Sequence, residues 1–249
     1  MSKSKFLIIP LLIAMVFILS ACQEFPKFNI VRGSGILITE DRPVSGFTAI
    51  QLDGAGRLFI VQGDSESLKI RADDNLMANL TAEVQEDTLV LGYREQFWRK
   101  TFLPSQPVVY ALTMTEMSTL TLNGAADVEI QALETEAFDL EIYGAGNVVV
   151  QSLSAEKLSV NLSGAGSVSV RGTVTEQTVH LDGASNYQAG GLQSRHTSIE
   201  INGLGQGIVW AAETLQTNIN GGGSVSYYGA PEVVQQISGL GEVRNLGKK

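Results

Sequence analysis

Apolar and polar residues alternate along most of this chain, and short glycine-rich segments interrupt the alternation. Around Gly144, apolar residues stand two, four and six positions before the glycine and four and six positions after it. Alternation with a period of two is typical of half-buried β-strands, and glycine marks the turn between two strands. The apolar positions of this unit are Phe138, Leu140, Ile142, Val148 and Val150.

The same unit recurs along the chain. The first glycines of the units are Gly54, Gly124, Gly144, Gly164, Gly183, Gly203, Gly221 and Gly239. From Gly124 onward the steps are 20, 20, 19, 20, 18 and 18 residues. A fixed period of this length, with no helical periodicity inside it, is the pattern of stacked strands in a solenoid. The sequence therefore predicts an all-β fold, a parallel β-helix of roughly ten coils about 4.8 Å apart.

Each coil must turn corners, where the backbone needs positive φ angles or very close approach, and glycine allows both. The residue before the first glycine is mostly Asn, Asp or Ser, and we expect these side chains to bond backbone groups of neighbouring coils. Phosphate binding is the functional alternative for glycine-rich loops. It is disfavoured because no unit continues as GxxxxGK[ST] and no GxGxxG begins an amphipathic helix.

Residues 1–21 have the features of a bacterial lipoprotein signal peptide. Lys3 and Lys5 precede an apolar run, 6–19, that is too short for a membrane span, and Leu-Ser-Ala-Cys ends at Cys22. This ending resembles a lipobox, in which cleavage precedes the cysteine and its thiol carries diacylglycerol. We therefore expect Cys22 to be the lipid attachment site and 22–32 to form the lipidated N-terminus and tether. The alternatives are an ordinary secretory signal and an uncleaved anchor.

Charge and cysteine content restrict the partners and the kinds of site that the chain can have. The net charge of −9 becomes −9 − 2 = −11 when the two lysines of residues 1–21 are removed, which argues against nucleic acid as a partner. Cys22 is the only cysteine, so a disulfide framework or cysteine metal site is not possible. We expect a bacterial envelope protein outside the cytoplasm, attached to the membrane through its lipid, with a surface glycan or an envelope protein as a further partner.

Residues 33–249 are expected to form a single solenoid domain. The segment Gly33-Ser34-Gly35 resembles a first, atypical coil, and Asp73-Asp74 is interpreted as a turn in preference to a cation site. The period is lost over 64–117, where an irregular insertion at 92–107 is rich in aromatic and basic residues. Its candidate contact residues are Phe97, Trp98 and Phe102. Packing of this loop against the solenoid is the interpretation we favour over partner binding.

The sequence contains no constellation that points to catalysis. His180 and His196 are not in metal-ligand spacing, and His180 falls at an outward strand position. A GxSxG elbow is also absent from the sequence. Carboxylates on adjacent coils build the sites of some β-helix enzymes, but the outward positions here are mostly Ser, Asn, Gln, Thr and Val. We expect no enzyme activity, no cofactor and no metal, and a polysaccharide-active or glycan-binding β-helix protein is the alternative.

The SGAG, NGAA and SGLG units, with the closing YYGAPEVVQQISGLGEV, resemble the head GIN domain family of auto-transporter adhesins. The resemblance covers about 45–243. It implies a right-handed parallel β-solenoid at the cell surface, acting as a structural, adhesion or protein-interaction module. It carries over no catalytic residues, and a chain with only this domain lacks the translocator barrel that the family name implies.

Overall fold

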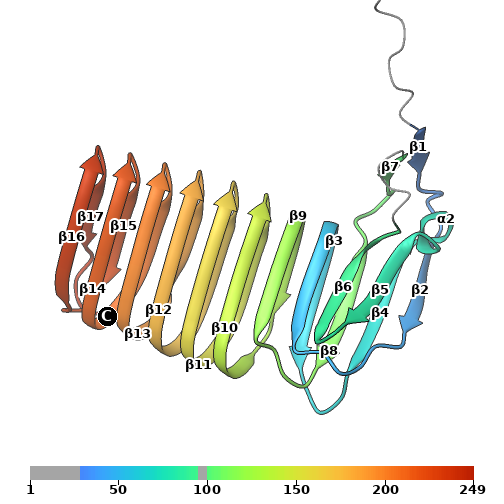
Figure 1. The fold of residues 1–249 in the computed structure, drawn as a ribbon, viewed down its shortest axis with the longest axis horizontal. Coiled ribbons are helices and arrows are strands. Elements are labelled where there is room, and N and C mark those ends of the chain that lie inside the picture. The colour runs from blue at the N-terminus through green and yellow to red at the C-terminus, as the bar shows by residue number, and fades with distance from the viewer. Residues whose placement is uncertain (1–28, 95–99) are drawn as a thin grey trace, which may run out of the picture.

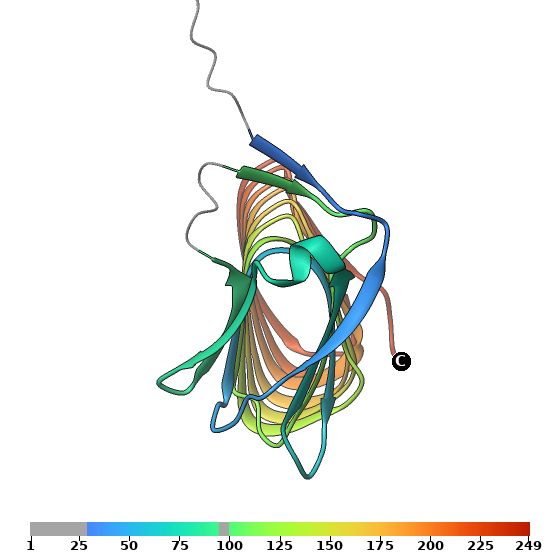
Figure 2. The same cartoon turned by 90° about the vertical axis from the view of Figure 1, so that its right-hand side faces the viewer.

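The computed structural model describes residues 29–94 and 100–249. It is 76% strand and 2% helix, and it forms a β-solenoid of about 6 turns with a spacing of about 20 residues (Figures 1 and 2). The solenoid prediction is confirmed, but the prediction of roughly ten coils is too high. The reason is that much of the chain before residue 118 pairs in an antiparallel manner and forms a separate cap at one end of the stack.

Parallel strands with matched registers make up the body of the solenoid. Equivalent residues pair from coil to coil, so that Gly124 lies beside Gly144, Gly144 beside Gly164, and Gly164 beside Gly183. The stack begins with β3 (Ala49–Gln62) and continues through β9 (Thr119–Ile130), β10 (Leu133–Gly144), β11 (Asn147–Gly164), β12 (Ser167–Gly183), β13 (Asn186–Gly203) and β14 (Gln206–Gly221). It ends with β15 (Ser224–Tyr228), β16 (Glu232–Gly239) and β17 (Glu242–Asn245).

The long strands bend, and their two halves lie on opposite faces of the solenoid (Figure 2). The half of β9 before its glycine pairs with β10, and the half after it pairs with β11. We call the sheet that precedes the glycines the pre-glycine face and the sheet that follows them the post-glycine face. The pre-glycine face contains 119–124, 139–144, 159–164, 178–183, 198–203 and 216–221, and the post-glycine face contains 127–130, 147–150, 167–170 and 186–189.

The core lies between the two faces and is filled by the apolar positions of the repeat. Phe138, Leu140, Ile142, Val148 and Val150 are all buried, as the alternation predicts. Because the stacked coils bury each other's apolar side chains, each coil depends on its neighbours for its core. At the C-terminal end the last coil has no neighbour beyond it. In that coil Ile237, which holds the repeat position of Ile142, is 40% exposed.

Glycine is required where the chain passes from one face to the other. Gly144 has φ +136°, and a Cβ built on it would lie 2.3 Å from the carbonyl oxygen of Gly124. That oxygen accepts a hydrogen bond of 2.8 Å from the backbone N–H of Ala145, and Gly144 itself accepts one of 3.0 Å from Ala165. The carbonyl of one coil therefore occupies the space that a side chain would need in the next.

The cap is built from strands before and between the first coils. β1 (Asn29–Arg32) pairs with β7 (Lys100–Leu103), and β2 (Leu37–Arg42) pairs with β4 (Ser67–Asp73), which in turn pairs with β8 (Val109–Met114). β5 (Leu80–Gln85) and β6 (Thr88–Tyr93) form a hairpin, and β6 and β8 both run parallel to β3. The cap lies at the opposite end of the stack from β16 and β17 (Figure 1).

Two local predictions in the cap are wrong. The segment Gly33–Gly35 is not a first coil, because it links β1 to β2, and β2 pairs with β4 in an antiparallel manner. The Asp73-Asp74 pair is not a simple turn, because Asp74 begins the short helix α2 (Asp74–Met77) and Asp73 is fully buried. In both places, tertiary pairing decides the structure, and local turn composition does not reveal it.

The glycine corner generates a stability prediction. Gly144→Val should lower the free energy of unfolding by at least about 2 kcal/mol, because the new side chain meets the Gly124 carbonyl at an unfavourable φ. The neighbouring control Ala145→Ser is at an exposed position and should change it by less than about 0.5 kcal/mol. Urea unfolding of both variants provides the measurement. Similar losses at the two positions would contradict this account of the corner.

Candidate functional site

The structure describes one of the four residues that the sequence singles out as site residues. Cys22, Phe97 and Trp98 lie outside the described residues. Phe102 lies in β7, where its ring stacks on Tyr93 at the end of β6 with centroids 5.5 Å apart and planes 19° apart. This contact brings the two ends of the irregular insertion together. Phe102 therefore packs on Tyr93, a residue of the same insertion, and is half-buried.

The stacked rings of Tyr93 and Phe102 line a surface hollow of about 540 Å³, which we call the aromatic hollow. Its floor is the glycine corner of β3, Gly54–Gly56, and its far wall includes Asp127 of β9. Tyr110 packs under this floor, where its ring lies 3.2 Å from the position that a Cβ on Gly56 would take. The Tyr110 hydroxyl is buried without a hydrogen-bond partner in the described structure, and burial raises the pKa of this group.

A second hollow of about 540 Å³ shares Arg57 and the 105–107 loop with the first, and we call it the arginine hollow. Its walls include Leu37, Arg57, Arg71, Gln106, Pro107 and Val109. Val109 of β8 pairs with Arg57 of β3 on one side and with Arg71 of β4 on the other. The two arginines therefore stand in one row across the sheet, two strand spacings or roughly 10 Å apart.

Asp73 holds together the loops that border the arginine hollow. Its Oδ1 accepts hydrogen bonds from the Gly35 N–H (2.8 Å) and the Ser105 hydroxyl (2.6 Å), and its Oδ2 accepts one from the Ser105 N–H (2.9 Å). The hydrogen bond from the Ser105 hydroxyl is the main reason that the pKa of Asp73 lies below its usual value. Burial acts in the opposite direction and is outweighed. Asp73 is therefore an ionised, buried carboxylate that joins β2, β4 and the loop before β8.

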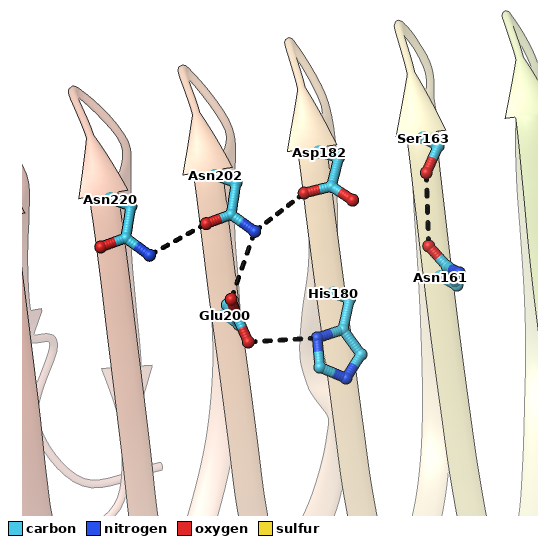
Figure 3. Close-up of polar contacts among 7 residues, drawn as sticks. All are labelled: Asn161, Ser163, His180, Asp182, Glu200, Asn202 and Asn220. Atoms are coloured by element: carbon cyan, nitrogen blue, oxygen red, sulfur yellow. Dashed lines mark hydrogen bonds and ion pairs between the residues drawn. The ribbon is translucent and has the colours of Figure 1, made fainter.

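The pre-glycine face carries a ladder of polar side chains (Figure 3). Asn220 Nδ2 donates to Asn202 Oδ1 at 3.0 Å, and Asn202 Nδ2 donates to Asp182 Oδ1 at 2.9 Å. These residues hold the same position, directly before the glycine, in three successive coils. We expected such side chains to bond backbone groups of neighbouring coils. They bond each other instead, because the coil-to-coil backbone ladder already uses the strand N–H and C=O groups.

A second row on this face stands two residues further from the glycine. His180 Nδ1 lies 3.5 Å from Glu200 Oε2, and Glu200 Oε1 accepts from Asn202 Nδ2 at 3.2 Å, which links the two rows. On the preceding coil, Ser163 donates to Asn161 across the same two rows at 3.5 Å. His180 is exposed, as its position in the repeat predicts.

His196, the second histidine, lies elsewhere, at the edge of the coil opposite the glycine corner. Its Nδ1 is 3.0 Å from the Thr214 hydroxyl, and its Nε2 is 3.7 Å from Glu213. Among residues 29–94 and 100–249, no group of three or more His, Cys, Asp and Glu side chains is placed to hold a metal ion. None of the helices in these ranges has the length and apolar character needed to span a membrane.

Sequence reasoning missed both Asp73 and the arginine row. Arg57 follows the Gly54-Ala55-Gly56 corner and could be placed on the post-glycine face from the repeat alone. Arg71 could not be placed beside it, because β4 joins the sheet in an antiparallel manner and outside the repeat. Asp73 was recognisable only as a polar residue at the end of an alternating strand.

Comparison with known proteins places the chain in a family. Residues 46–231 match the model of the family described as "Putative auto-transporter adhesin, head GIN domain". The chain belongs to this family, as the repeated glycine units predicted. Its membership supports a structural or adhesion role at the cell envelope or surface. No curated protein matches the chain.

Solved structures agree with the fold. A crystal structure of a putative adhesin from Bacteroides fragilis has a TM-score of 0.82 and 29% identity, and covers 87% of this chain and 100% of that one. A putative lipid binding protein from Parabacteroides distasonis has a TM-score of 0.73 and 22% identity, with 88% and 100% coverage. A putative adhesin from Parabacteroides merdae has a TM-score of 0.66 and 20% identity, with 88% and 99% coverage. The last two show the fold alone.

The Asp73 contacts generate a prediction on stability and its pH dependence. Asp73→Asn should lower the free energy of unfolding at neutral pH by about 2 kcal/mol or more, because the amide cannot accept all the hydrogen bonds that the carboxylate accepts. Since folding lowers the pKa of Asp73, its contribution is complete above the usual value of 3.8 and is lost as pH falls through the folded pKa.

Urea unfolding from pH 7 to pH 2.5 checks this prediction. The wild type should lose this contribution below about pH 3.8, and Asp73→Asn should lack that part of the loss. Asp64→Asn, at an exposed carboxylate without a hydrogen bond in the described structure, is the matched control and should behave as wild type. A wild-type pH dependence in Asp73→Asn would contradict the assignment.

Proposed function

We propose that this chain is a lipid-anchored, non-catalytic adhesion module of the bacterial cell envelope, and that its pre-glycine face is the contact surface. The observation that carries the proposal is the ladder of Asn, Asp, Glu and His side chains on that face (Figure 3). Membership of the adhesin family supports the same role. The basic, apolar and Leu-Ser-Ala-Cys order of 1–22 supports the anchor.

The ladder suits adhesion because its side chains are held in place before a partner arrives. Asn202 is hydrogen-bonded on three sides, by Asp182, Glu200 and Asn220, and the strands beneath are fixed by the coil-to-coil register. Immobilising side chains on binding costs free energy, and a surface that is already ordered avoids much of that cost. The same polar rows are repeated on successive coils, so the face can contact an extended partner at several points.

A glycan-binding or polysaccharide-active protein is the second candidate function. The aromatic hollow favours the binding part of this alternative, because aromatic faces are a common surface for sugar rings. The carboxylates of the polar ladder favour adhesion over hydrolysis. Asp182 and Glu200 both accept hydrogen bonds from Asn202, so both carboxylates are already engaged within the ladder.

The proposed anchor generates a direct test. Cys22→Ser should prevent lipid attachment, so the protein should move from the membrane fraction to the soluble fraction or to the medium. Mass spectrometry of the mature N-terminus of the wild type should find a diacylglycerol-modified Cys22. An unmodified Cys22 in wild-type protein extracted from membranes would be incompatible with the proposal.

The proposed contact surface generates a second test. Replacing Glu200 and Asn202 with Ala should greatly reduce attachment of protein-coated beads to a panel of bacterial cells and immobilised surface polysaccharides. Unfolding temperature should change little, because both side chains are partly exposed and their hydrogen bonds are on the surface. Ser169→Ala, on the post-glycine face, is the control and should attach as wild type. Unchanged attachment of the double variant would exclude this face.

A further inference from the structure

The two hollows of the cap are neighbours on the protein surface. They share Arg57 and the 105–107 loop, and together they extend from the Tyr93–Phe102 stack to Arg71. The protein as a whole is acidic, with a net charge of −9. The arginine hollow differs from this overall charge, because its lining includes two arginines and no carboxylate.

Three described arginines form ion pairs with carboxylates, and Arg57 and Arg71 are among those that do not. Arg42 pairs with Glu40, Arg195 with Glu213, and Arg244 with Glu242. Within residues 29–94 and 100–249, the Arg57 and Arg71 side chains have neither an ion pair nor a hydrogen bond. An unpaired guanidinium in a concave site is well suited to bind a carboxylate, phosphate or sulfate group through two parallel N–H donors.

Two carboxylates lie close to the arginines without pairing with them. Asp127 is the neighbour of Arg57 in the strand register, and its Oδ1 accepts a hydrogen bond of 2.9 Å from Asn147. Asp73 lies two residues after Arg71, and its carboxylate is buried and already bonded to Ser105 and Gly35. Both carboxylates accept hydrogen bonds from other donors, and neither forms an ion pair with Arg57 or Arg71 in the described part of the chain.

The backbone keeps the two arginines apart at a defined distance. Both flank Val109 on the same side of the sheet, and two strand spacings separate their Cα atoms by roughly 10 Å. A chain that carries an anionic group on more than one unit can offer a separate group to each guanidinium, and its rings can also lie against the aromatic hollow beside Arg57.

We propose that the joined hollows bind an acidic glycan, with Arg57 and Arg71 each contacting a carboxylate on a different sugar unit and the Tyr93–Phe102 wall contacting a sugar ring. This inference goes beyond the proposed function, because it assigns a ligand to a surface other than the pre-glycine face. Nucleic acid also carries repeated anionic groups, but two arginines on an acidic protein do not neutralise enough phosphates for such binding.

Binding of uronic acid oligosaccharides to full-length protein in detergent tests the proposal. The probes are oligomers of galacturonate, of mannuronate and guluronate, and of hyaluronan, with methyl-esterified oligogalacturonate as the uncharged match. Calorimetry should detect binding of at least one acidic oligomer, weakened at least tenfold by esterification and weakened by added salt. Lack of binding by every acidic oligomer, or equal binding of the esterified form, would overturn the proposal.

Arginine variants locate the binding. Arg57→Gln and Arg71→Gln should each weaken the affinity severalfold, and the double variant at least tenfold, with an unchanged circular dichroism spectrum. Arg244→Gln, on the post-glycine face at the far end of the stack, should bind as wild type. A double variant that binds with wild-type affinity would show that the glycan binds elsewhere.

The bead assay keeps the two proposals apart. The arginine double variant retains the polar ladder, and the Glu200 and Asn202 variant retains both hollows. Attachment to cells without binding to any acidic oligomer would leave the adhesion proposal standing and remove this one. Binding to acidic oligomers by a protein that does not attach to cells would leave the glycan proposal standing and remove the adhesion proposal.

Discussion

The close approach of the backbone at the glycine corner is the constraint on which the rest of the structure depends. The Gly124 carbonyl lies where a Cβ of Gly144 would be, and the same contact is repeated between Gly144 and Gly164. With side chains excluded from these positions, each coil can lie directly on the one before it, with equivalent residues paired. The apolar side chains then form a continuous core, and the outward polar side chains form rows. A shift of one residue would reverse both patterns.

The polar ladder is a consequence of this register. Asn202 lies between Asp182 and Asn220 because the three coils are in register at their glycines, which follow these residues directly. The backbone groups of the strands are already paired from coil to coil. The side chains therefore bond one another or water, and the bonds among them order this face. Core, corner and polar ladder thus derive from one repeated backbone contact.

The repeat could be predicted from the sequence because the corner contact recurs and leaves a glycine in every coil. The strand positions around Gly144 and their burial follow from the same period. The cap could not be predicted in this way, because β2, β4, β5 and part of β8 pair in an antiparallel manner and each pairing occurs once. The buried role of Asp73 and the nearness of Arg57 to Arg71 depend on those pairings. Overestimating the number of coils had the same cause, since strands of the cap were counted as coils.

The two hollows lie in the cap, whereas the polar ladder lies on the coils beyond it. β1, the first described strand, belongs to the cap and begins at Asn29, seven residues after Cys22 in the chain. Seven extended residues span at most about 25 Å, so an anchor at Cys22 would hold the cap near the membrane. The coils from β9 to β17 extend away from the cap (Figure 1). Under the proposed anchoring, the arginine hollow would meet glycans close to the protein's own membrane, and the ladder would meet partners at other distances. The two surfaces would then contribute independently, because the rigid stack between them does not allow both to contact one short ligand.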